Sequence, residues 1–208
     1  MTPTSRRRIF LLSPANVGGI RGGHLLGPRG KSELARRLRG EGATLGEVFS
    51  FISELYFRGK LAYAEAFADP PPDVPGALVI TSCGLTLPHT IVTLDRLQQL
   101  ASVPVDAEDP RYRLALERDC RALFASASED TDFVLLGSVA TGKYLDPMFA
   151  IFGDRLLFPE DFAGRGDMSR GGLLLRAARA GEPLRYVPIG SMTRHGARPA
   201  KLPKLPRR

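Results

Sequence analysis

The sequence predicts a three-layer α/β/α sandwich around a mainly parallel, Rossmann-like sheet of about five strands. Two observations support this fold class. The candidate strands are short and apolar throughout, which is typical of a parallel sheet covered by helices on both faces. Most of them are separated by segments with helical patterning, as repeated βαβ units require. The 208 residues are enough for one domain with a sizeable core.

The first half of the chain contains two expected strands, residues 8–13 and 77–81, because both are short and apolar. A helix begins at Thr44, since Thr44 and Glu47 form a capping box. The other helices expected here are residues 32–39, residues 60–68, which continue the Thr44 helix or form a second one, and residues 94–100.

The second half continues the alternation of helices and strands. Asp109 and Pro110 are an N-cap followed by proline at the first helical position, so they start a helix at residues 111–125. The further expected elements are a strand at 133–136, a helix ending at 152, a strand at 155–158, a loop at 159–172, a helix at 173–180 and a strand at 184–189. We expect residues 1–190 to form a single domain and residues 191–208 to form a basic, proline-containing tail.

Charge and composition narrow the range of partners. The net charge of +7 and the pI near 9.8 favour anionic partners, either nucleic acid or a phosphate-containing small molecule, although basic tails also serve solubility alone. No apolar run approaches the ~18 residues of a membrane helix, so we expect a cytoplasmic protein without a membrane partner. Two cysteines and three scattered histidines predict neither a disulfide framework nor a metal site, and we expect no cofactor.

Three glycine-rich segments follow strand ends in this scheme: residues 13–23, 137–143 and 164–172. Parallel strands bring their carboxyl ends to one edge of the sheet, where ligands bind in such folds. Backbone N–H groups in glycine turns and at helix starts favour anions. The candidate ligand-binding residues are Ser13, Asn16, Gly18, Gly19, Arg21, Thr90, Gly137, Ser138, Thr141, Gly142, Lys143, Arg165, Ser169 and Arg170.

The middle segment, GSVATGKY, is one residue away from the phosphate-binding pattern G-x-x-x-x-G-K-[ST]. Tyr144 stands where a hydroxyl would bind magnesium, which argues against ATP or GTP hydrolysis. Two interpretations stay open. The segment is an ordinary glycine turn between a strand and a helix, or it binds phosphate or ribose without the chemistry of a P-loop enzyme.

The other two segments also have a structural and a functional interpretation. Asn16 either stabilises its own turn or reads a base edge, with Arg21 meeting a phosphate. Asp167 is the candidate catalytic residue, as a general base, but a simple ion pair with Arg165 or Arg170 explains it as well.

Several ordered motifs give the chain a resemblance to a known group. These motifs are IFLLSPANVGGIR, ELYFRGKLAYAEAFA, LVITSCGLTLPHTIVTLD, VLLGSVATGKYLDPM and GRGDMSRGGLLLR. The chain resembles a family of uncharacterised bacterial α/β proteins that are distantly similar to the uracil-DNA-glycosylase-like domain of archaeosine synthase. The resemblance covers about residues 9–176 and implies a three-layer α/β/α fold with a pocket suited to a base or nucleoside. The water-activating motifs G-Q-D-P-Y and G-E-A-P-G of the glycosylases are absent.

The function expected from these observations is the handling of a nucleotide, nucleoside or nucleic-acid base. The protein would bind a phosphate-bearing ligand at the carboxyl edge of the sheet, as an N-glycosidase or a transferase. The alternative is a non-catalytic, basic nucleic-acid-binding protein that uses Arg36, Arg37 and Arg39.

Overall fold

The computed structural model describes residues 6–28, 30–139, 142–191 and 202. A six-stranded sheet with the strand order β4-β3-β1-β6-β7-β8 forms its centre. Its strands are β1 (Arg7–Leu12), β3 (Ala77–Thr81), β4 (Gly84–Thr86), β6 (Thr131–Leu136), β7 (Leu156–Pro159) and β8 (Tyr186–Pro188). The four inner strands run parallel, and only the edge strands β4 and β8 are antiparallel to their neighbours. The expected mainly parallel sheet is therefore confirmed.

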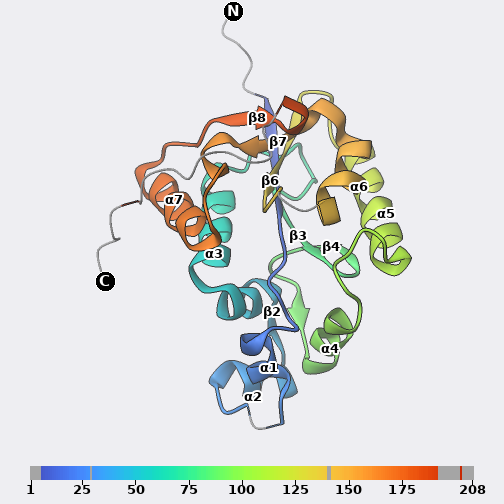
Figure 1. Cartoon of the computed structure of the whole chain (residues 1–208), viewed down its shortest axis with the longest axis vertical. Helices are drawn as coiled ribbons and strands as arrows, with labels where there is room; N and C mark the ends of the chain where they lie inside the picture. Colours follow the sequence, from blue (N-terminus) through green and yellow to red (C-terminus); the bar gives the residue numbers. More distant parts are fainter. Residues whose placement is uncertain (1–5, 29, 140–141, 192–201, 203–208) are drawn as a thin grey trace, which may run out of the picture.

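Helices cover both faces of this sheet, as Figure 1 shows. On one side lie α3 (Leu45–Phe67) and α7 (Asp167–Ala180), which pack along each other. On the other side lie α5 (Pro110–Ser126) and α6 (Gly142–Phe152), which also contact each other. The layers thus match the expected α/β/α arrangement.

A smaller group of elements gathers beyond the carboxyl end of β1 (Figure 1). It comprises α1 (Ile20–Leu26), α2 (Glu33–Arg39), α4 (Leu94–Ser102) and a two-stranded sheet of β2 (Ala43–Thr44) and β5 (Ile91–Val92). Short 3-10 turns at Gly153–Arg155, Glu160–Phe162 and Ile189–Ser191 complete the described elements. This group covers the edge of the sheet at which parallel strands end.

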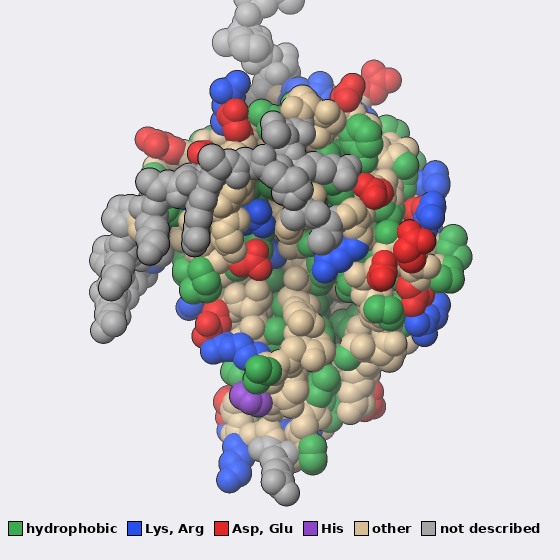
Figure 2. Space-filling view, viewed as in Figure 1, with side chains coloured by type: hydrophobic (Ala, Val, Ile, Leu, Met, Phe, Trp, Pro, Cys, Tyr) green, Lys and Arg blue, Asp and Glu red, His purple; other side chains and the backbone are tan. Residues whose placement is uncertain are grey.

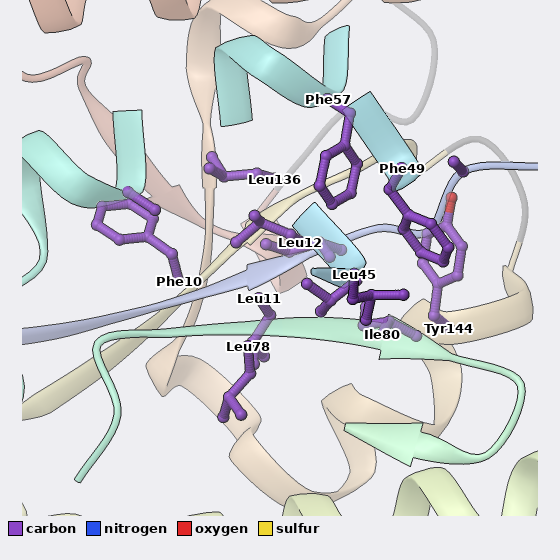
Figure 3. Packing of buried hydrophobic residues seen from close by; sticks show 14 of the residues in the cluster. Phe10, Leu11, Leu12, Leu45, Phe49, Phe57, Leu78, Ile80, Leu136 and Tyr144 are labelled. Carbon is purple, nitrogen blue, oxygen red and sulfur yellow. The ribbon is translucent and has the colours of Figure 1, made fainter. Parts of the chain in front are cut away.

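The core forms where the central strands meet α3. Residues 9–12 of β1 and 133–136 of β6 are completely buried. Figure 3 shows Leu12 and Leu136 packed near Phe57 of α3. Burying a large apolar side chain stabilises the fold by about 1.5–3 kcal/mol, so these strands are a rigid support for the loops that follow them.

The capping signals set the helix boundaries as expected. Thr44 caps α3, and Glu47 completes the capping box by accepting the Thr44 backbone N–H at 3.0 Å. The bond from Arg37 and those from Thr44 lower the pKa of Glu47 to about 2. Residues 60–68 continue α3, which deviates from helical geometry at Glu54, where φ is 44°.

Four local expectations were wrong. Part of the loop expected around residues 14–24 is helix α1, and helix α7 starts at Asp167 inside the loop expected at 159–172. The last strand is shorter than residues 184–189 and antiparallel. Strand β4 lies in the segment 82–93, where no strand was expected. Gly84 turns the chain at φ 103° there, and the Asp119 carboxylate accepts the Leu85 N–H at 2.8 Å.

Most of the predicted tail lies outside the described residues, which include only Leu202 beyond Ser191. Within the described part of the chain, no helix is both long and apolar enough to cross a bilayer.

Candidate functional site

The strand order places a topological switch point between β1 and β6. The chain leaves β1 towards β3 on one side and later returns to β6 on the other side, so the loops after β1 and β6 start next to each other. Ser13 N donates to Leu136 O at 3.1 Å across this boundary. A Cβ on Gly137 would lie 2.9 Å from the Ser13 Cβ, so glycine permits the close approach. Ligands of open α/β sheets bind at such points.

A cavity of about 400 Å³ opens beside this boundary. The first glycine segment lines it with residues 14–18, and α6 contributes Lys143 and Tyr144. Its other walls are Phe49, Thr81, Ser82, Leu100, Ala101 and residues 103–105. Figure 3 shows Phe49 and Tyr144, two of these lining residues, beyond the end of β1. Two of the three predicted segments therefore meet at one cavity.

Polar groups of the first segment are available on the wall of this cavity. Within the described chain, the amides of Asn16, Val17 and Gly18 donate no hydrogen bond, and neither does the Asn16 side chain. The Asn16 carbonyl closes the turn by accepting Gly19 N–H at 3.1 Å. Lys143 forms no ion pair with any described residue, and its ammonium lies 5.7 Å from the centre of the Tyr144 ring. Free amides and a cation are the groups that bind anions.

Tyr144 links the P-loop-like segment to Ser13, the start of the first glycine-rich segment. Burial raises the pKa of its phenol, while hydrogen bonding to the Ser138 backbone and to the Ser13 hydroxyl lowers it. The side chain that replaces the magnesium-binding hydroxyl is thus buried against the end of β1. Gly142 starts α6 just before it, and Thr141 lies outside the described residues.

Lys60 of α3 is the most unusual group near the switch point. It is completely buried, and its Nζ donates to both the carbonyl and the hydroxyl of Ser13 at 2.8 Å. The ammonium also lies 4.0 Å from the centre of the Tyr56 ring. No carboxylate of the described residues pairs with it.

Burial lowers the pKa of Lys60 to about 7, and the Arg170 guanidinium contributes in the same direction while Asp167 opposes it. Burial also raises the pKa of Tyr56, whose hydroxyl has no hydrogen-bond partner in the described chain. The switch point therefore combines a serine with a buried lysine whose pKa is lowered towards neutrality.

The third glycine segment contributes one buried cation and little else to this region. Arg170 is 9% exposed and donates to Phe162 O at 3.3 Å, and its guanidinium lies 3.6 Å from the Asp167 carboxylate. Asp167 itself is 67% exposed. Arg165 donates to Asp161 O and to Ser169 Oγ, which ties these two residues to the segment itself.

One glycine of this third segment, Gly171, has a packing role. A Cβ on Gly171 would lie 2.6 Å from Leu55 O, and a Cβ on Gly59 of α3 would lie 2.6 Å from Gly171 O. The expectation of a glycine loop over residues 164–172 was wrong from Asp167 onwards, because α7 starts there and contains Gly171 at its contact with α3.

Two candidate residues lie away from the cavity. Arg21 donates to Phe51 O at 2.9 Å and pairs with Glu54 at 2.5 Å. Thr90 precedes β5, where its carbonyl accepts Leu45 N–H and its amide donates to Leu87 O. Neither residue lines the cavity at the switch point.

Sequence reasoning did not select Lys60, although a signal exists. Lys60 follows Tyr56 by four residues and precedes Tyr63 by three, so it stands in the apolar stripe of an amphipathic helix. A lysine at such a position is either buried with a hydrogen-bond or ion-pair partner, or it interrupts the apolar stripe.

The arginines available for nucleic acid are largely engaged within the protein. Arg36 pairs with Glu33, Arg37 pairs with Glu47, and Arg39 donates to backbone carbonyls. Along α5, each exposed arginine has a carboxylate partner, namely Arg111 with Asp109, Arg113 and Arg121 with Glu117, and Arg118 with Asp119. Figure 2 shows the resulting mixture of positive and negative side chains on the side of α5.

Comparison with known proteins adds no assignment: no family model, no curated protein and no solved structure matches the chain. In the described residues, no group of three or more histidine, cysteine or carboxylate side chains is placed to hold a metal ion. The argument for function therefore depends on the geometry of the switch point.

Proposed function

We propose that the protein binds a nucleoside phosphate in the cavity at the switch point and acts on it as a hydrolase or transferase. One observation carries this proposal. The cavity lies at the ligand-binding position of an open α/β sheet, and its wall presents Lys143 together with the free amides of residues 16–18.

The two kinds of wall suit the two parts of such a ligand. Lys143 and the loop amides suit the phosphate, because charge-assisted bonds to N–H groups and ammonium groups are the strong ones. The Asn16 amide suits a base, because it can exchange hydrogen bonds with a base edge, and Phe49 and Tyr144 supply apolar parts of the wall. The size of about 400 Å³ falls in the usual range for small-molecule sites.

Isothermal titration calorimetry on the full chain tests this proposal. The ligands are AMP, GMP, CMP and UMP, with ribose 5-phosphate and inorganic phosphate as partial ligands. We expect one nucleotide to bind best and Lys143→Ala to weaken it about tenfold or more, the effect of losing one charge-assisted bond. Lys31→Ala is the matched control, because Lys31 does not line this cavity.

Two results would count against the proposal. Nucleotide binding that is equally strong in Lys143→Ala and the wild type would place the ligand elsewhere. Absence of binding by any of the six ligands, together with salt-dependent binding of a single-stranded oligonucleotide, would favour the nucleic-acid-binding alternative.

A further inference from the structure

The pair formed by Ser13 and Lys60 has the geometry of a nucleophile with its base. The distance of 2.8 Å between Lys60 Nζ and Ser13 Oγ is that of a direct hydrogen bond. Serine is a weak nucleophile until a neighbouring base takes its proton, and lysine serves as that base in Ser–Lys variants of the catalytic triad. A lysine can do so only when it is held neutral.

The surroundings of Lys60 favour its neutral form by lowering its pKa. Its side chain is completely buried, and the nearest charged groups of α7 are a cation, Arg170, and a mostly exposed carboxylate, Asp167. The rings of Tyr56 and Tyr144 form the remaining titratable neighbours, and burial keeps both phenols protonated. Desolvation together with a second cation is a known way to activate a lysine.

Ser13 is placed next to the cavity. It directly follows β1, at the carboxyl edge of the sheet. Ser13 is 4% exposed, and its neighbours Pro14, the next residue, and Tyr144, whose pKa the Ser13 hydroxyl lowers, both line the cavity.

We propose that Ser13 is a covalent nucleophile, that Lys60 is its general base, and that the substrate is a phosphate ester bound in the adjoining cavity. The choice of a phosphate ester rests on the proposed function, whereas the nucleophile and base rest on the Ser13–Lys60 geometry alone.

The step balances with the groups present. Ser13 Oγ forms a bond to phosphorus while Lys60 Nζ takes the hydroxyl proton, and the bond from phosphorus to the leaving alcohol oxygen breaks. Lys60 then returns the proton to that oxygen. In the second half, a water oxygen forms a bond to phosphorus and water loses a proton to Lys60. The bond between phosphorus and Ser13 Oγ breaks, and Lys60 returns the proton to Ser13 Oγ as phosphate leaves.

Labelling with an alkyl fluorophosphonate tests the nucleophile without a known substrate. Attack by Ser13 forms the oxygen–phosphorus bond and expels fluoride, while Lys60 receives the proton. Trypsin cuts after Arg8 and Arg21, and the peptide between these cuts contains Ser13 as its only hydroxyl side chain. Mass spectrometry therefore assigns a modification of this peptide without ambiguity.

We expect Ser13 to be labelled in the wild type and the label to vanish from this peptide in Ser13→Ala. Lys60→Met and Lys60→Arg should slow labelling at least about a hundredfold, the usual contribution of a general base. The control is Ser102→Ala, because Ser102 is an exposed serine on α4. We expect this variant to be labelled like the wild type. Circular dichroism shows whether each variant is folded.

The variant Asp167→Asn tests whether the general base is Lys60 or Asp167. Asp167 raises the pKa of Lys60, so its removal should enlarge the neutral fraction and move the rise of labelling with pH to lower values. A loss of labelling in Asp167→Asn with normal labelling in folded Lys60→Arg would overturn the proposal and support Asp167 as the base.

The outcomes also distinguish this proposal from the proposed function. Nucleotide binding with an unmodified Ser13 would overturn the nucleophile and leave the cavity as a binding site. Labelling of Ser13 without binding of any nucleotide would support the nucleophile and contradict the ligand class.

Discussion

The first and third glycine-rich segments look alike in the sequence but differ in the structure. In the first, the amides of residues 16–18 are unpaired on a cavity wall, and a Cβ on Gly18 would meet only the Asn16 side chain, at 3.7 Å. In the third, Gly171 lies inside α7 against the backbone of α3. Glycine therefore has two physical uses here: it leaves a cavity wall open in one segment and lets a helix approach closely in the other.

The largest effect should come from filling the helix contact. Gly171→Ala places a methyl group 2.6 Å from Leu55 O and 2.7 Å from Tyr56 Cα, where neither backbone can move easily. We expect the free energy of unfolding to fall by about 3 kcal/mol, the upper part of the range for overpacking. Urea denaturation measures it.

Gly172→Ala is the control one residue away. Its Cβ would meet only Arg176 Nη1, at 3.2 Å, and that flexible side chain can shift. Alanine favours the helix by about 0.8–1.0 kcal/mol over glycine, so this variant should be neutral or stabilised. Similar losses in both variants would contradict the packing role assigned to Gly171.

The next effect concerns the pH dependence of the free energy of unfolding, to which the buried Lys60 contributes. Because the folded-state pKa of Lys60 is lowered to about 7 from 10.5, the unfolded chain binds more protons between these values. The contribution of Lys60 to stability is therefore lowest below pH 7 and rises as the pH increases. We expect the wild type to gain up to about 1.4 kcal/mol per pH unit relative to Lys60→Met between pH 7 and 9.

Urea denaturation of both proteins at half-unit pH intervals measures this difference. Lys31→Met, which removes an exposed lysine away from the cavity, is the control for the loss of one lysine. Parallel pH profiles for the wild type and Lys60→Met would show that Lys60 is not held neutral in the folded state.

The smallest effect on stability should come from the first segment. Gly18→Ala adds a methyl group beside the Asn16 side chain only, so stability should change by less than about 0.5 kcal/mol. Nucleotide binding should weaken nevertheless, because the methyl group enters the cavity wall. Calorimetry and denaturation on the same sample separate the two effects, and a large loss of stability would contradict the open character of this loop.

The fold could be predicted because its signals are local. Apolar runs such as residues 77–81 and the capping box at Thr44 and Glu47 determine elements without knowledge of distant residues. Lys143 and Asn16, which line the same cavity, were also selected from their positions after strands. Their loops meet because parallel strands end at one edge.

The remaining features depend on contacts between distant residues. The pairing of Ser13 with Lys60 joins positions 47 residues apart, and the pattern of the helix around Lys60 gives no indication of its partner. Gly171 and Gly172 follow a loop-like sequence. Only the path of α3 shows that Gly171 is needed for packing. Edge strand β4 likewise depends on a carboxylate of α5, Asp119.

A titration of ¹⁵N-labelled protein with AMP, GMP, CMP and UMP, followed by heteronuclear NMR, tests the central claim most directly. We expect the amide signals of Asn16, Val17, Gly18 and Lys143 to move with the nucleotide that binds, while those of Gly171 and Gly172 stay in place. Movement centred on residues 165–172, with the signals of residues 16–18 unchanged, would contradict the assignment of the ligand to the switch point.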